Sequence, residues 1–157
     1  MAHAEELFPV LSEEMLYEFL DEEPPTSVEA LRQKLARSES RKSPDGSEHW
    51  LNWVVRNDLR QVVGYVQATV FPHGDTNVAY FIGSAHWGRG LAYRAVDEML
   101  RILAVEFGVN AFLIRTERAN GRSIRLAERL GFSPATPERS AQKGIAPNEL
   151  LMQKAMP

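Results

Sequence analysis

The chain has 157 residues, 44% of them apolar and 25% charged, and its formal net charge at pH 7 is −3. This balance argues against a dedicated nucleic-acid-binding protein, which is usually basic. Because the chain has no cysteine, disulfides, a zinc–thiolate site and a covalent acyl-cysteine intermediate are excluded. The length and apolar content predict one domain, residues 1–157, with a full hydrophobic core.

The sequence lacks targeting and metal-binding signals. It holds no apolar run of about 18 residues that could span a membrane. Its acidic start, residues 1–6, lacks the basic flank and apolar stretch of a signal peptide. His49, His73 and His86 fall in predicted loops or turns without metal-ligand spacing. We therefore expect a cytoplasmic protein with no metal site and no membrane contact.

The first third of the chain is predicted to be helical. Apolar residues recur at helical spacing through residues 4–20, and a break near Pro9 or Ser12 is expected to divide this stretch into two pieces. Thr26-Ser27-Val28-Glu29 is a capping box in which Thr26 bonds forward and Glu29 reaches back. A second helix is therefore expected from Ser27 to about Ser38.

An antiparallel meander of three strands is predicted next. Residues 50–56, 61–71 and 78–82 are rich in β-branched and aromatic residues. Two short polar segments, residues 57–60 and 72–75, turn the chain between them.

The second half of the chain alternates helices and strands. The predicted elements are a long helix over 90–107, a strand over 111–117, a short helix over 124–130, an irregular loop over 134–147 and a closing strand over 150–155. Gly108 and Gly131 stand where helix C-caps belong. This order of elements predicts an α+β fold with helices on the faces of one sheet.

A glycine-rich turn, His86-Trp87-Gly88-Arg89-Gly90-Leu91-Ala92, separates the third strand from the long helix. Glycines let backbone N–H groups point inward, and a helix start adds unpaired donors, so this arrangement favours a phosphate group. Arg89 adds a full positive charge. The turn is not a nucleotide triphosphatase loop, because no Lys-Ser/Thr follows the glycines. It is not the dinucleotide pattern either, because Tyr93 stands where a third small residue is needed.

A second motif follows the strand that ends at Glu117. Its residues are Asn120-Gly121-Arg122-Ser123-Ile124-Arg125-Leu126-Ala127-Glu128-Arg129-Leu130-Gly131-Phe132. Together with Trp87-Gly88-Arg89-Gly90-Leu91-Ala92, this stretch resembles the acyl-coenzyme-A-binding core of the GCN5-related N-acetyltransferases (GNAT superfamily). The resemblance is to the branch that includes the ribosomal-protein N-terminal acetyltransferases. It covers residues 78–132, whereas the first third of the chain matches only loosely.

The resemblance implies a mixed, mostly antiparallel sheet with helices on both faces. The family fold usually opens with a strand before the first helix, but this chain starts almost directly in helix. We expect that first strand to be missing or residual. One sheet edge would then be shorter than usual, and a partner subunit could cover it.

The resemblance also implies that acetyl-CoA binds along the glycine turn and the neighbouring strand. The backbone N–H groups from Gly88 to Ala92 would hold the diphosphate, and a bulge near Gly83 would turn an N–H toward the thioester carbonyl. Asn120 and Ser123 would hold the distal half of the cofactor, unless they only cap their helix. The expected cofactor-binding set is Ile82, Gly83, Trp87, Gly88, Arg89, Gly90, Leu91, Ala92, Asn120 and Ser123.

The catalytic groups are harder to assign. Many relatives place a tyrosine on the helix after the Asn motif to protonate the leaving thiolate, but residues 124–127 are Ile, Arg, Leu and Ala. Tyr80, Glu117 and Ser123 remain as candidates, with water or solvent as alternative acids. Glu117 would accept a proton, unless it is a surface carboxylate paired with Arg115 or Arg118. Tyr80 would serve the site or pack in the core.

Charged side chains suggest two further contacts. Arg122 or Arg125 would attract the 3′-phosphate of the cofactor, unless their helix is only a solvated basic face. The acidic run of residues 21–23 would attract a cationic amine, unless it is simply an exposed turn.

The sequence therefore predicts an N-acetyltransferase that uses acetyl-CoA and a primary amine of a small molecule or a peptide N-terminus, as a monomer or homodimer. A non-catalytic CoA-binding sensor or regulatory module is the alternative. A binding protein for another phosphorylated ligand is a third, weaker possibility.

Overall fold

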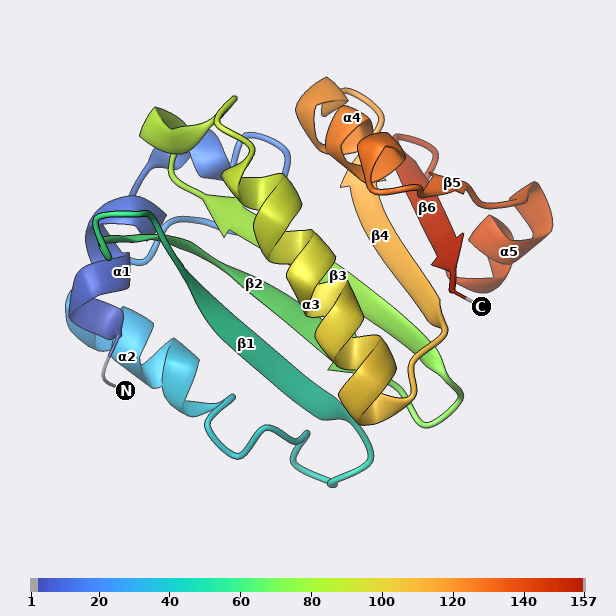
Figure 1. Cartoon of the computed structure of the whole chain (residues 1–157), viewed down its shortest axis with the longest axis horizontal. Coiled ribbons are helices and arrows are strands. Elements are labelled where there is room, and N and C mark those ends of the chain that lie inside the picture. The colour runs from blue at the N-terminus through green and yellow to red at the C-terminus, as the bar shows by residue number, and fades with distance from the viewer. Residues whose placement is uncertain (1–2, 157) are drawn as a thin grey trace.

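The computed structural model describes residues 3–156 (Figure 1). Residues 1–2 of the acidic start and residue 157, all within the predicted 1–157 domain, lie outside the described part. The elements are α1 (Ala4–Leu11), η1 (Glu14–Leu16), α2 (Val28–Ala36), β1 (His49–Arg56), β2 (Val62–Val70), β3 (Asp75–Ile82), η2 (Ser84–His86), α3 (Leu91–Phe107), β4 (Ala111–Glu117), α4 (Gly121–Arg129), β5 (Ser133–Pro134), α5 (Pro137–Gln142) and β6 (Glu149–Ala155).

One six-stranded sheet organises the chain, in the order β1-β2-β3-β4-β6-β5. Only β3 and β4 run parallel, and every other neighbouring pair is antiparallel. The predicted α+β fold with a mixed, mostly antiparallel sheet is therefore confirmed. Within residues 3–156 no strand precedes α1, so β1 forms one edge of the sheet.

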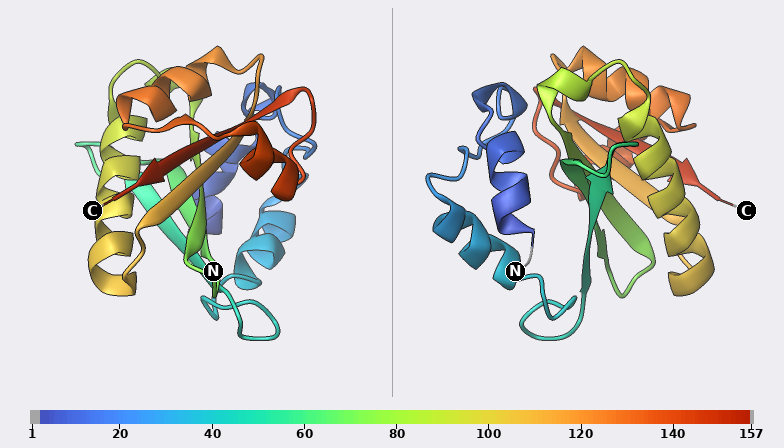
Figure 2. Two further views of the ribbon diagram at one scale, coloured as in Figure 1. Left: turned by 90° about the vertical axis from the view of Figure 1, so that its right-hand side faces the viewer. Right: turned by 60° about the vertical axis from the view of Figure 1, so that its left-hand side comes forward.

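Helices cover both faces of this sheet (Figure 2). On one face, α3 and α4 bury Val96, Leu103 and Ala127 in the larger core cluster. On the other face, α1 and α2 bury Leu7 and Leu31 against the sheet. Because successive strand residues point to opposite faces, β3 contributes Tyr80 to the α3 side and Phe81 to the α1 side.

The sheet opens between its two parallel strands. β3 and β4 pair only from Asp75↔Ala111 to Asn77↔Leu113, although β3 continues to Ile82 and β4 to Glu117. Figure 1 shows the two strands diverging toward the end of the molecule that carries α4 and the turn into α3. This divergence creates the cleft described below.

Two helix starts differ from the sequence predictions. α4 begins at Gly121 rather than Ile124, because the side chain of Asn120 already accepts a hydrogen bond from the Ser123 N–H. In α2 the N-cap is Ser27 rather than Thr26: its hydroxyl oxygen accepts the Ala30 N–H at 3.1 Å. Both differences follow from which side chain reaches the first free N–H groups of the helix.

Two segments are organised differently from the predictions. The stretch over 134–147 is not an irregular loop, because it contains α5, whose N-cap Thr136 accepts the Arg139 N–H at 3.3 Å. Residues 4–20 do break near Ser12, but the second piece is only the short 3₁₀ turn η1. Residues 17–26, which follow η1, therefore form an irregular segment beside the sheet, called the arm below.

Candidate active site

A cleft of about 650 Å³ lies where β3 and β4 diverge. It brings together most of the residues that the sequence analysis singled out: Tyr80, Ile82, Trp87, Gly88, Gly90, Leu91, Ala92, Glu117, Asn120 and Ser123. Gly83 and Arg89 do not line it. Residues that are distant in the sequence thus share one site: Tyr80 and Ser123, which are 43 positions apart, are in contact.

The glycine turn presents open backbone donors. Gly88 and Gly90 both have φ of +74°, in the left-handed region that favours glycine. The first hydrogen bond of α3 is donated by the Arg94 N–H to the Gly90 carbonyl, at 3.1 Å. Within residues 3–156, the N–H groups from Gly88 to Tyr93 make no hydrogen bond. The turn and the start of a 17-residue helix therefore offer a set of free donors, together with the partial positive charge of the helix.

Trp87 fixes this turn against the end of β3. Its indole Nε1–H donates to the Ile82 carbonyl at 2.7 Å. The guanidinium of Arg122 lies 3.8 Å from the centroid of the indole ring, which is a cation–π contact between the turn and α4. The position of the glycine turn is thus set from two sides of the cleft.

The predicted bulge near Gly83 is wrong. The β2–β3 register is unbroken from Gly64↔Ile82 to Val70↔Thr76, and the Gly83 N–H donates to the Val63 carbonyl at 2.9 Å. Bonded pairs alternate along an antiparallel ladder, so the backbone groups of Tyr80 and Ile82 point away from β2, toward the opening beside β4. The donors that face the cleft therefore belong to these two residues and not to Gly83.

Tyr80 and Ser123 form a polar contact across the cleft wall. The Tyr80 phenol oxygen lies 2.7 Å from the Ser123 hydroxyl oxygen, and the phenol also donates to the Ser123 carbonyl at 3.2 Å. Burial raises the pKa of Tyr80 above its usual value, although the Ser123 hydrogen bond opposes this shift. The phenol is therefore neutral at physiological pH and can donate a proton.

Asn120 has the capping role that was considered for it. Its side-chain oxygen accepts the Ser123 N–H at 3.0 Å and so caps the N-terminus of α4. Asn120 still lines the cleft.

Glu117 is a free carboxylate at the far side of the cleft. Arg115 instead forms a two-point ion pair with Glu149, with N···O distances of 2.7 and 2.5 Å. Arg118 donates through Nε to the Pro147 carbonyl at 3.1 Å. Within residues 3–156, the Glu117 carboxylate makes no hydrogen bond or ion pair, so the considered pairing with Arg115 or Arg118 is not present.

Glu117 and Tyr80 lie on opposite faces of the sheet. Phe112 and Ile114 of β4 pack on the α3 side, so Glu117, an odd-numbered residue of the same strand, faces the α1 side. Tyr80 faces α4 and Ser123. The cleft therefore passes through the sheet, with the glycine turn on one face and Glu117 on the other.

The sequence analysis missed a wall of this cleft. Four apolar residues of η1 and the following arm line it: Met15, Leu16, Phe19 and Leu20. Their apolar spacing resembles that of a core helix, so the sequence carries no separate signal for this role. Asp21, from the acidic run considered for a cationic amine, also lines the cleft. Glu149 and Asn148, at the start of β6, also line the cleft and were not predicted.

Within residues 3–156, no helix is long and apolar enough to cross a membrane. In the same part of the chain, no group of three or more His, Asp or Glu side chains is placed to hold a metal ion.

The six-stranded sheet of this α+β fold opens between its two parallel strands, beside a glycine turn with free N–H groups. This arrangement is typical of an acyltransferase. The sequence places the chain more specifically: residues 1–133 match the family described as the acetyltransferase (GNAT) domain. The chain belongs to this family of GNAT acetyltransferases, whose members transfer the acetyl group of acetyl-CoA to amines.

Solved structures share this fold at low sequence identity. RimL, a ribosomal L7/L12 α-N-protein acetyltransferase in complex with coenzyme A, superposes with a TM-score of 0.81 at 17% identity, covering 99% of this chain and 89% of that one. A GCN5-related N-acetyltransferase from Brucella melitensis gives 0.76 at 21% identity, with coverages of 98% and 71%. The spermidine N-acetyltransferase from Vibrio cholerae in complex with CoA and spermine gives 0.71 at 14% identity, with coverages of 99% and 89%. No curated protein matches the chain.

Proposed function

We propose that this protein, acting as one domain, moves the acetyl group of acetyl-CoA to a primary amine of a small molecule or a peptide N-terminus. The observation that carries the proposal is the pairing of two features in one cleft. Free N–H groups from Gly88 to Tyr93 lie on one side, and the unpaired carboxylate of Glu117 lies on the other. The Trp87–Ala92 and Asn120–Phe132 motifs support the branch of ribosomal-protein N-terminal acetyltransferases.

The chain offers separate groups for each part of acetyl-CoA. The N–H groups around Gly88 and Gly90 suit the diphosphate, and Arg89 adds charge from outside the cleft wall. Tyr80 and Ile82 offer backbone groups to an extended pantetheine arm, which would lie along β3 as an added strand. Arg122 and Arg125, which both line the cleft, are the candidates for the 3′-phosphate.

The reaction then needs a proton acceptor and a proton donor. Bound acetyl-CoA supplies the acetyl group and a thiolate leaving group. Glu117, directly or through a water molecule, accepts the proton that an ammonium must lose before attack. The backbone N–H of Tyr80 or Ile82 stabilises the developing oxyanion, a contact worth about 3–4 kcal/mol in other acyl-transfer enzymes. The neutral Tyr80 phenol donates a proton to the sulfur, directly or through the Ser123 hydroxyl.

The alternative is a CoA-binding sensor without catalysis. It is favoured by one observation, the lack of a tyrosine among residues 124–127 of α4. The position of the Tyr80 phenol beside Ser123 weighs against it, because this phenol lies at the same wall of the cleft. Release of free thiol from acetyl-CoA in the presence of a panel of amines separates enzyme from sensor.

Binding of acetyl-CoA, measured by isothermal titration, tests the phosphate site. Gly88→Val and Gly90→Val are expected to weaken binding at least tenfold, because valine disfavours the left-handed φ of 74° that orients the donors. Gly46→Val is the matched control, since Gly46 has the same φ of 74° and also no atom within 4 Å of an added Cβ. Wild-type protein that fails to bind below millimolar acetyl-CoA would refute the proposed function.

A further inference from the structure

We infer that the acceptor amine carries an apolar group next to its nitrogen, and that Met15, Phe19 and Leu20 receive this group. The inference rests on the proposed function and names the substrate class of the same site. The shared chemistry is a protonated amine attached to an alkyl or aryl body. Its source is either a small monoamine or a peptide whose first side chain is apolar.

Two of the four large apolar side chains that are exposed in residues 3–156 lie at the cleft. Four large apolar residues in the described part of the chain are exposed: Met15 at 54%, Leu20 at 43%, Leu59 at 78% and Val105 at 73%. Met15 and Leu20 line the cleft together with the half-buried Phe19, whereas Leu59 and Val105 do not. Apolar side chains exposed at the wall of a concave site are typical of ligand contact.

The segment that carries these residues, η1 and the arm after it, is anchored to the cofactor side of the cleft. The Glu13 carboxylate accepts the Ser84 N–H at 2.8 Å, just before the glycine turn. The ring of Tyr17 lies 6.2 Å from that of Phe81 on β3. Beyond it, Glu18 pairs with Arg122 of α4 at 3.4 Å. The wall is therefore held in a defined place before any ligand binds, which lowers the entropic cost of binding.

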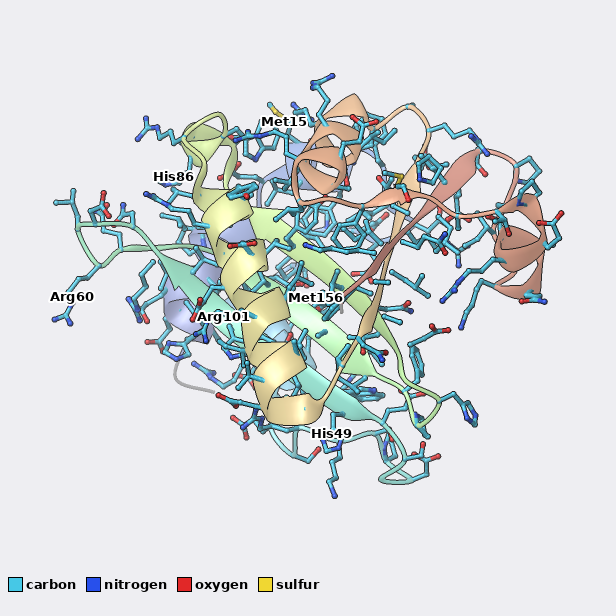
Figure 3. The ribbon with its side chains drawn as sticks, turned by 45° about the vertical axis from the view of Figure 1, so that its right-hand side comes forward. Met15, His49, Arg60, His86, Arg101 and Met156 are labelled. Atoms are coloured by element: carbon cyan, nitrogen blue, oxygen red, sulfur yellow. The ribbon has the colours of Figure 1, made fainter. Side chains whose placement is uncertain are left out.

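The position of Met15 agrees with this role. Figure 3 shows Met15 at the end of the molecule where His86 marks the turn after β3, and far from His49 at the opposite end. Both Met15 and His86 line the cleft. The apolar wall therefore borders the opening in which the thioester would lie.

The charges on the same side favour a cationic acceptor. Glu117 is unpaired and Asp21 also lines the cleft, so an ammonium meets negative charge there. Arg115 is occupied by Glu149, so an acceptor carboxylate would meet no free cation from this residue. A second ammonium placed against Met15, Phe19 and Leu20 would lose part of its hydration to apolar side chains, a cost that an alkyl or aryl group does not carry. These features favour an apolar monoamine over a polyamine.

The first test compares acceptors at saturating acetyl-CoA. The panel is 2-phenylethylamine, a peptide with N-terminal leucine, the same peptide with N-terminal aspartate, and spermidine. We expect kcat/KM for 2-phenylethylamine or the leucine peptide to exceed that for spermidine and the aspartate peptide at least tenfold. Whichever of the two apolar acceptors is faster identifies the source of the amine.

The second test changes the wall. Met15→Ser and Leu20→Ser are each expected to raise KM for the apolar acceptor about tenfold, in line with the cost of losing a hydrophobic substrate contact, and to leave the Kd of acetyl-CoA unchanged. Leu59→Ser and Val105→Ser are the matched controls, because both remove an exposed apolar side chain that lies outside the cleft. All four side chains are exposed, so these variants are expected to fold.

The outcomes separate the two proposals. If acetyl-CoA binds and spermidine or the aspartate peptide is preferred, or no acceptor in the panel is acetylated, the inference is overturned and the cofactor site stands. If Met15→Ser and Leu20→Ser affect KM no more than the two controls do, the inference is also overturned. If acetyl-CoA does not bind, the proposed function fails and the inference fails with it.

Discussion

The Tyr80 phenol oxygen lies 2.7 Å from the Ser123 hydroxyl oxygen and joins β3 to α4 at the wall of the cleft. Ser123 comes from the Asn120–Phe132 motif, and Tyr80 comes from the strand that precedes the glycine turn. We propose that the Tyr80 phenol serves in place of the tyrosine that residues 124–127 of α4 lack.

Tyr80→Phe is expected to lower kcat by about 100-fold, the lower end of the effect of a general acid, with little change in the Kd of acetyl-CoA. Tyr65→Phe is the matched control, because Tyr65 is also buried but packs against α1 on the other face. The measurement is steady-state release of free thiol with both variants. Equal kcat for Tyr80→Phe and Tyr65→Phe would show that Tyr80 only packs in the core.

Glu117→Gln is expected to lower kcat/KM for the amine by about 100-fold at pH 7. The amide cannot accept the proton of the incoming ammonium, whose reference pKa for a lysine-like amine is about 10.4. The defect should shrink as the pH rises, because solvent then deprotonates the amine. The measurement is a pH profile of kcat/KM, with Glu128→Gln as an exposed control on α4 that does not line the cleft. A defect of constant size from neutral pH to about pH 10, near the amine pKa, would assign Glu117 a purely structural role.

The parts of the structure that could be predicted are those with local signals. Gly88, Gly90 and Gly108 mark backbone positions with positive φ, and their placement alone predicted where α3 begins and ends. Strand β4 was predicted with its full bounds, and its first four residues are an apolar run that follows the turn at Gly108. The Asn120 and Ser123 positions followed from their motif, although the cap at Asn120 starts α4 three residues earlier than expected.

The parts that could not be predicted depend on tertiary contacts. Helical spacing in residues 4–20 predicted two helical pieces, but η1 and the arm after it leave Met15 and Leu20 exposed at the cleft. The bulge near Gly83 was inferred from the family, whereas the pairing with Val63 in β2 decides where that N–H points. The helix α5 did have a local signal, Thr136 followed by Pro137, but it is only six residues long.

The Glu6–Arg56 ion pair gives stability that depends on pH. Hydrogen bonding to Arg56, at 2.8 and 2.9 Å, is the main reason that the pKa of Glu6 falls from 4.5 to about 2. A carboxyl with a lowered pKa stabilises the fold above its unfolded pKa, and this contribution is lost as the pH falls from about 4.5 through about 2. The free energy of unfolding of Glu6→Gln should therefore fall less steeply with decreasing pH in this window than that of the wild type.

Urea unfolding at several pH values measures how steeply the free energy of unfolding depends on pH in each protein. Glu14→Gln is the control, as an exposed carboxylate outside this pair. Because both partners are exposed to solvent, added salt should reduce the difference between wild type and Glu6→Gln. A wild type and a Glu6→Gln variant with parallel pH profiles would mean that the pair contributes nothing measurable.

Gly64→Ala is expected to destabilise the fold and close part of the cleft. A Cβ at Gly64 would lie 1.9 Å from the Phe81 carbonyl oxygen and 2.9 Å from the Ile82 Cα. Since both atoms are backbone, β3 must shift as a unit, and the free energy of unfolding should fall by about 3 kcal/mol, as for overpacked sites. Gly46→Ala, which meets no atom within 4 Å, should cost about 1–2 kcal/mol, the local cost of its left-handed backbone. Urea denaturation compares the two, and acetyl-CoA titration of Gly64→Ala should also show weaker binding, because Ile82 ends the strand beside which the cofactor is expected to lie. Unchanged stability in Gly64→Ala would mean that β2 and β3 approach each other less closely in solution.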